Sequence, residues 1–151
     1  MASIHLESLG VIGKIESTEE EINQISKDRF TFHYIPNVQI IDCLKSNITV
    51  LKDPSLNIPQ IKFPYAKIPK SYSLRETVSV AEYLMEGYRQ RFLGDYSISS
   101  SSVYKNGRGV LFFGGATNLG KSTFALDLTK SGFNLFSDEK TVIHLEEAIM
   151  R

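Results

Sequence analysis

The residues best suited to chemistry lie between Gly115 and Ser122, where the chain reads Gly-Ala-Thr-Asn-Leu-Gly-Lys-Ser. A glycine, four residues and then Gly-Lys-Ser is the spacing typical of loops that bind nucleotide phosphates. Glycine allows a compact turn whose backbone N–H groups face inward, and a helix starting directly after the loop adds its positive N-terminus. The predicted phosphate contacts are Gly115, Ala116, Thr117, Asn118, Leu119, Gly120, Lys121, Ser122 and Thr123.

Three side chains carry the predicted chemistry. The Lys121 ammonium would neutralise the β and γ phosphates, and the Ser122 hydroxyl is a hard oxygen ligand that suits Mg²⁺. Asp138 follows the apolar run Phe133 to Phe136, at the strand end where a parallel sheet presents carboxylates to such a loop. We expect Asp138 either to hold the metal, directly or through water, or to take a proton from an attacking hydroxyl. The alternative for Asp138-Glu139 is a solvated turn.

Several elements must position these residues. Val110 to Phe113 predicts a buried strand before the loop, and Lys121 to Lys130 predicts a helix closed by Gly132. Asn106-Gly107 separates two strand-like segments and favours a type I′ hairpin. With the strand after the helix, this order predicts a short βαβ unit in a parallel sheet.

The earlier part of the chain is expected to be rich in strands. Arg29 to Ile35 alternates aromatic and polar residues, and Asn47 to Leu51 is β-branched and apolar, so both predict strands. Ile15 to Ile25 predicts a short helix with carboxylates near its N-terminus. Prolines at every fifth position between Asp53 and Tyr72 predict an extended connector without helix or central strand.

The domain boundary is expected at the end of that connector. Ser73 and Glu76 form a capping-box pattern, and apolar residues then recur at helical spacing to about Leu93, where Gly94 supplies a stop. We therefore predict a β-rich lobe with its connector over 1–72 and the N-terminal part of a nucleotide-binding domain over 73–151.

Composition narrows the class of protein and its partners. Lys plus Arg and Asp plus Glu both number 17, so no overall charge attracts nucleic acid or an anionic membrane. The apolar run near the motif is too short to cross a membrane, and the start lacks a basic and apolar leader, so a cytoplasmic protein is expected. The 151 residues fit one domain but are few for a complete nucleotide-dependent enzyme, and a fragment is one interpretation.

From Tyr96 to about Leu145 the chain resembles the HPr serine kinase/phosphorylase family, whose P-loop core is shared with the phosphoenolpyruvate carboxykinase group. The resemblance rests on the hairpin, the glycine-rich loop, its helix, and the strand ending at Ser137-Asp138-Glu139. It implies an α/β fold with an incomplete P-loop core behind a β-rich N-terminal lobe. The positions matching the family's nucleotide and magnesium site are Gly115, Gly120, Lys121 and Ser122, and Asp138 matches the first of its paired acidic residues.

The chain departs from the family at three places. Glu139 stands where the second acidic residue is usually Asp, Asn118 replaces a loop glycine, and a serine near Ser99 stands where the family often has a histidine. The absence of that histidine weakens what the resemblance implies about catalysis and about reversal of the reaction.

The function implied by the resemblance is transfer of the γ-phosphoryl group of ATP, with Mg²⁺, to a hydroxyl of a protein, a peptide or a small molecule. One alternative is a nucleotide-binding regulatory module without an acceptor. Another is a catalytically incomplete fragment without kinase activity. Exposed apolar edges would further favour self-association into a homo-oligomer.

Overall fold

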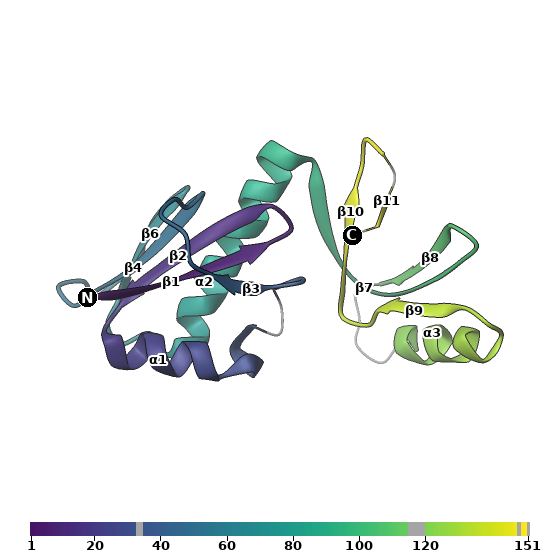
Figure 1. The fold of residues 1–151 in the computed structure, drawn as a ribbon, viewed down its shortest axis with the longest axis horizontal. Helices are drawn as coiled ribbons and strands as arrows, with labels where there is room; N and C mark the ends of the chain where they lie inside the picture. Colours follow the sequence, from purple (N-terminus) through teal and green to yellow (C-terminus); the bar gives the residue numbers. More distant parts are fainter. Residues whose placement is uncertain (33–34, 115–119, 148, 151) are drawn as a thin grey trace. The chain divides into compact units, whose positions relative to one another are not determined.

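The structure is a computed structural model that describes residues 1–32, 35–114, 120–147 and 149–150. It divides into two units, Met1–Leu93 and Gly94–Arg151 (Figure 1). The elements of the first unit are β1 Ala2–Ser8, β2 Val11–Ser17, α1 Glu19–Lys27, the 3₁₀ helix η1 Arg29–Phe32, β3 Gln39–Ile41, β4 Ile48–Asp53, β5 Gln60–Lys62, β6 Tyr65–Pro69, α2 Leu74–Tyr88 and the π-helical turn η2 Arg89–Leu93. Those of the second are β7 Asp95–Lys105, β8 Arg108–Phe113, α3 Lys121–Lys130, β9 Asn134–Ser137, β10 Lys140–His144 and β11 Ile149–Met150.

The first unit is built on a mixed six-stranded sheet of order β3-β1-β2-β4-β6-β5. β1 and β2 form an antiparallel hairpin, and Leu9 and Gly10 turn it with positive φ. β4 runs parallel to β2, and β6 runs parallel to β4. The two edge strands of the sheet, β3 and β5, are short and antiparallel to their neighbours.

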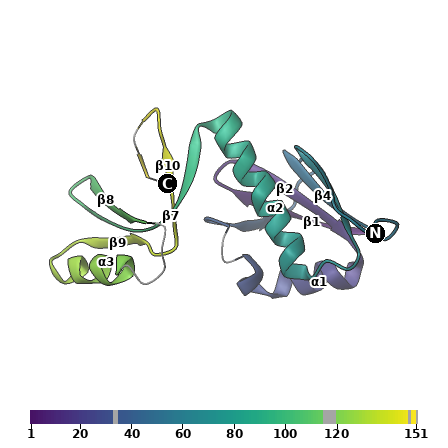
Figure 2. The same cartoon turned by 180° about the vertical axis from the view of Figure 1, so that it is seen from behind.

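One face of this sheet forms the core of the first unit. Alternate residues of β1, β2 and β4 are buried, as expected when one side of a sheet is covered. α2 crosses this sheet over β2 and β4 (Figure 2), and the α1 residues Ile22 and Ile25 join the same buried cluster. At Gly13 a Cβ atom would lie only 2.9 Å from the Met85 sulfur, so glycine lets α2 approach β2 closely.

Several predictions that rest on local sequence patterns in the first unit are confirmed. The strand at Asn47 to Leu51 is confirmed as β4. The acidic helix is confirmed as α1, but it begins at Glu19 and not at Ile15, because Ile15 to Ser17 belong to β2. The capping box is confirmed, since Ser73 accepts from the Glu76 N–H and the Glu76 side chain accepts from the Ser73 N–H.

Two predictions for the first unit are wrong. Arg29–Phe32 is a 3₁₀ helix, not part of a strand, and residues 33–34 lie outside the described residues. The segment from Asp53 to Tyr72 is not a plain connector, because it contains β5 and the interior strand β6. Its prolines sit where they cost no ladder bond: Pro64 precedes β6 and Pro69 is its last residue.

The two units meet in sequence after α2, not before it. The prediction placed this helix with the nucleotide-binding domain because its cap follows the proline-containing segment. In the structure, α2 packs on β2, β4 and β6 and therefore belongs to the first unit. Gly94, with φ 69°, follows the π-helical turn that extends α2.

The second unit is organised around the long strand β7. β8 pairs with one part of it, and β9 and β10 pair with it successively; all of these pairings are antiparallel. The predicted hairpin is confirmed, since Asn106 and Gly107 both have positive φ between β7 and β8. α3 packs against β7, β8 and β9 (Figure 1), and its bounds match the predicted helix.

The predicted P-loop core in a parallel sheet is wrong. Over the described residues the fold is mixed α/β, with two sheets and three α-helices. β8 and β9, which precede and follow α3, do not pair with each other, because β7 lies between them and is antiparallel to both. The predicted burial of these two strands is also wrong, since most of their residues are exposed. Among the helices that the structure describes, none is long and apolar enough to cross a membrane.

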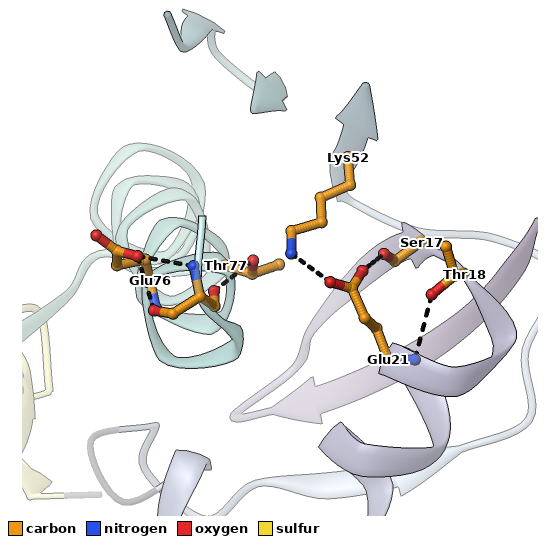
Figure 3. Close-up of polar contacts among 7 residues, drawn as sticks. Ser17, Thr18, Glu21, Lys52, Glu76 and Thr77 are labelled. Atoms are coloured by element: carbon orange, nitrogen blue, oxygen red, sulfur yellow. Dashed lines mark hydrogen bonds and ion pairs between the residues drawn. The ribbon is translucent and has the colours of Figure 1, made fainter. Parts of the chain in front are cut away.

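A partly buried ion pair fastens α1 to the sheet of the first unit (Figure 3). The Lys52 ammonium, on β4, lies 2.6 Å from one Glu21 carboxylate oxygen, and the Ser17 hydroxyl donates to the other. Burial alone would raise the pKa of Glu21, but hydrogen bonds from Lys52 and Ser17 and the charges of Lys52 and Lys70 together lower it. A lowered carboxyl pKa contributes stability above the ordinary value of about 4.5 and loses it as pH falls through the folded-state pKa.

Glu21→Gln is expected to lower the free energy of unfolding by about 1.5–3 kcal/mol at neutral pH, because it removes a charged hydrogen bond and leaves the Lys52 ammonium buried without its counter-charge. The difference from wild type should begin to shrink below about pH 4.5 and be lost as pH falls through the lowered folded-state pKa of Glu21. Urea unfolding followed by circular dichroism between pH 3 and 7 measures both effects. Glu20→Gln, on the exposed side of the same turn, is the control; an equal loss in both variants would contradict the ion-pair account.

Candidate functional site

The start of α3 has the properties expected of an anion site. Gly120 occupies the N-cap with φ 77°, and no side chain in the described part of the chain caps this end. The first-turn N–H groups of a helix have no intrahelical acceptor, and they attract negative charge together with the helix dipole. Lys121, Ser122 and Thr123 form this first turn, and the hydroxyl residues Ser122 and Thr123 are exposed. The predicted contacts Gly115, Ala116, Thr117, Asn118 and Leu119 lie outside the described residues.

A chain of oxygen atoms joins α3 to the residue after β9. The Ser101 hydroxyl, on β7, donates to the Asp138 carboxylate at 2.6 Å. The same hydroxyl oxygen lies 3.4 Å from that of Ser122. Ser101 is buried, whereas Ser122 and Asp138 are exposed, so the outer two groups are accessible while the middle one is held by the sheet. The structure thus brings together Ser122 and Asp138, both predicted metal ligands, through a residue that was not predicted.

A β-bulge decides which acidic side chain faces Ser101. Val103 is paired with Leu135, but Ser102 is paired with Ser137, so Phe136 is the extra residue. Lys140 then pairs with Ser99, which puts Asp138 opposite Ser101. Residues opposite one another share a face of the sheet, and a one-residue slip moves a side chain to the other face. Without the bulge, Asp138 would point away from α3.

The serine-rich run on β7 has different roles on its two faces. Ser101 faces α3, whereas Ser100 and Ser102 face the other side and contact Thr141 at 2.8 and 2.9 Å. Thr141 also lies 3.1 Å from the Ser137 hydroxyl, which donates to the Lys140 carbonyl. One assignment satisfies all four hydroxyls: Thr141 accepts from Ser100 and Ser102 and donates to Ser137. Each of these hydroxyls therefore has a hydrogen-bond partner, and the cluster joins β7 to β10.

Sequence reasoning missed Ser101, although it noted a serine near Ser99 at the family's histidine position. Nothing in the composition of the run from Ser97 to Ser102 distinguishes Ser101 from its neighbours. Its role depends on which strands pair with β7 and on the bulge at Phe136, and neither is visible as a motif.

The polar side chains of His144 and Glu21 already have partners within the chain. The His144 Nδ1 lies 2.7 Å from a carboxylate oxygen of the buried Asp95, and the two residues are paired across β10 and β7. In the first unit, a cavity of about 320 Å³ is lined in part by Lys52, Lys70 and Glu21. The Glu21 carboxylate oxygens in that cavity are already bonded to Lys52 and Ser17 (Figure 3).

Within the described ranges, no group of three His, Cys, Asp or Glu side chains gathers to hold a metal ion.

Comparison of the chain with family models, curated proteins and solved structures gives no match. The resemblance to the HPr kinase family therefore stays a prediction that rests on the quoted residues alone.

Thr141→Val is expected to destabilise the second unit by about 1–3 kcal/mol, because it removes the partner shared by the buried hydroxyls of Ser100 and Ser102, although Ser100 keeps the Ile98 carbonyl as an acceptor. Thermal unfolding monitored by circular dichroism provides the measurement. Thr129→Val, which removes an exposed hydroxyl bonded within α3, is the matched control and should change little. If both variants unfold like wild type, the hydroxyl cluster does not hold β10 to β7.

Proposed function

We propose that the second unit binds ATP with Mg²⁺ at the start of α3 and transfers the γ-phosphoryl group to a hydroxyl. The observation that carries the proposal is the approach of Asp138 to Ser122 through Ser101, directly beside the Gly120-Lys121-Ser122 segment. The motif supplies phosphate-binding groups and the strand pairing supplies an acidic oxygen next to them. Neither feature depends on a parallel P-loop core.

The phosphate groups are assigned to α3. Its uncapped first turn offers backbone N–H donors, and the Lys121 ammonium adds a full positive charge. Phosphoryl transfer needs little covalent help from a protein, because the charge spread over the transferred group is stabilised by fixed donors and cations. These groups would hold the triphosphate in position and offset its charge.

The donor set fits magnesium. Ser122 and Asp138 present a hydroxyl and a carboxylate, which are hard oxygen ligands, and Mg²⁺ commonly takes only one or two protein ligands beside phosphates and waters. Ser122 and Asp138 would hold the ion, and Ser101 would fix the orientation of the Asp138 carboxylate by its hydrogen bond. When bound, the ion would add positive charge at the β and γ phosphates.

Asp138 is also the acidic group available to receive a proton. In the transfer, the bond from the γ phosphorus to the bridging oxygen breaks, ADP leaves, and the acceptor oxygen bonds to phosphorus. The acceptor loses its proton, and the Asp138 carboxylate would take it if it acts as the base. The Ser101 hydroxyl donates to this carboxylate and would therefore hold it in a fixed orientation toward the acceptor.

A regulatory module is the second candidate, and one observation favours it. The residue opposite Asp138 is Ser101, and a serine at this position supplies no second base of the kind a histidine would provide. In that case nucleotide binding would change a partner contact without transfer. A fragment without kinase activity, a cytoplasmic location and a homo-oligomeric state remain predictions.

Lys121→Ala is expected to weaken Mg-ATP binding about tenfold or more, because a charged hydrogen bond to phosphate contributes about 1.5–3 kcal/mol. Titration with a fluorescent ATP analogue measures the affinity, and circular dichroism checks the fold. Lys130→Ala, at the opposite end of α3 and paired with Asp127, is the control that removes the same charge. Equal affinity in Lys121→Ala and wild type would refute the phosphate assignment.

Asp138→Asn is expected to reduce magnesium-dependent ATP binding or phosphoryl transfer about tenfold, whereas Glu139→Gln should change either by less than about twofold. The reason is that Asp138 lies beside Ser101 and Ser122, while Glu139 is the exposed neighbour of the same charge. Affinity is measured over a Mg²⁺ series, and transfer is measured with labelled ATP and hydroxyl acceptors. Equal and negligible effects of both changes would assign the pair to a solvated turn.

A further inference from the structure

A pocket of about 400 Å³ lies at the junction of β8 and α3. Among the described residues, its lining combines four apolar side chains with one cation: Leu111, Phe112, Phe113, Phe124 and Lys121. We infer that this pocket binds the purine base of the nucleotide, an inference that rests on the proposed function of the neighbouring phosphate site. It would make the ligand a purine nucleotide instead of a bare polyphosphate.

Exposed aromatic surface is the first argument. The Phe113 side chain is 71% exposed and that of Phe124 is 60% exposed, although both belong to regular elements next to the motif. The rings of Phe112 and Phe124 stack with centroids 6.0 Å apart and planes inclined by 21°. Phe112 and Phe124 are already in contact, so a base would stack on the opposite face of the Phe124 ring, within the pocket that Phe113 also lines. Aromatic side chains in such a position stack on bases with useful affinity.

Continuity with the phosphate site is the second argument. Lys121 belongs both to this pocket and to the first turn of α3. The ring of Phe124 lies 3.7 Å from the position that a Cβ on Gly120 would occupy, so the ring packs beside the N-cap itself. A base stacked on Phe124 therefore leaves its phosphates next to Gly120 and Lys121. A pocket of this size, mostly apolar with one convergent charge, is typical of small-molecule sites.

The position of the pocket on the sheet is the third argument. It lies at β8, which within the described residues pairs on only one side, with β7. Another strand could also cover this edge. The lysine at the start of α3 adds a positive charge to the lining, which favours an anionic ligand over an apolar strand. Association with another strand through β8 is therefore the alternative that the experiment must distinguish from nucleotide binding.

The test compares Mg-ATP with Mg-tripolyphosphate, which has the phosphates but no nucleoside, on the full chain by isothermal titration. Wild type is expected to bind ATP about 5- to 100-fold more tightly, the range that base–aromatic stacking spans, and CTP less tightly than ATP. Phe124→Ala should remove most of that advantage and leave the tripolyphosphate affinity unchanged. Leu126→Ala is the control, because it removes another exposed apolar side chain of α3 outside the pocket.

The outcomes are distinguishable. Equal affinity of wild type for ATP and tripolyphosphate would overturn the base pocket and leave the phosphate site standing, whereas binding of neither would overturn the proposed function. Equal loss of both ligands in Phe124→Ala would show that the ring supports only the phosphate site. A change of sedimentation in Phe124→Ala with unchanged affinities would make the surface a protein contact. If Phe124→Ala fails to fold by circular dichroism, Phe113→Ala at the end of β8 carries the same expectation and the same contradicting result.

Discussion

The candidate site depends on how β7 is shared between its neighbours. Its hydrogen-bonding edges are occupied by β8 on one side and by β9 and β10 on the other, so its register decides which residues of these three strands lie opposite it. Strand alternation sends Ser101 toward α3 and Ser102 toward the hydroxyl cluster around Thr141. Ser101, beside the proposed site, and Ser102, in the hydroxyl cluster, can therefore be adjacent in sequence, because the strand places them on opposite faces.

The bulge at Phe136 adds a second constraint. It shifts the pairing by one residue between Val103 and Ser102, and so it brings Asp138 opposite Ser101. The exposed carboxylate then gains a partner that is held by a buried strand, which restricts its orientation without burying its charge. The proposed phosphate site therefore draws on the start of one helix, the centre of one antiparallel strand and the residue after β9. The reaction class does not require the parallel core expected from the resemblance.

Sequence predicted the elements whose signals are local. The helix from Lys121 to Lys130, the capping box at Ser73 and the Asn106-Gly107 turn are each encoded within a few residues. Strand partners are not encoded in this way: the run Val110 to Phe113 is equally apolar in a parallel interior strand and in an antiparallel edge strand. β6 was missed because its prolines suggested a connector, and Ser101 was missed because its role depends on long-range register. Lys121, Ser122 and Asp138 stay predicted site residues, whereas the contacts that join Ser122 to Asp138 through Ser101 could not be predicted from the sequence.

Amide NMR spectra of the labelled full chain during titration with Mg-ATP test the central claim most directly, because they locate the ligand residue by residue. The account predicts saturable shifts concentrated at Ser101, at the first turn of α3 and at Asp138, with little change in β1 to β6 of the first unit. Shifts confined to the first unit, for example around the cavity lined by Lys52 and Lys70, or no shifts at millimolar nucleotide, would contradict it.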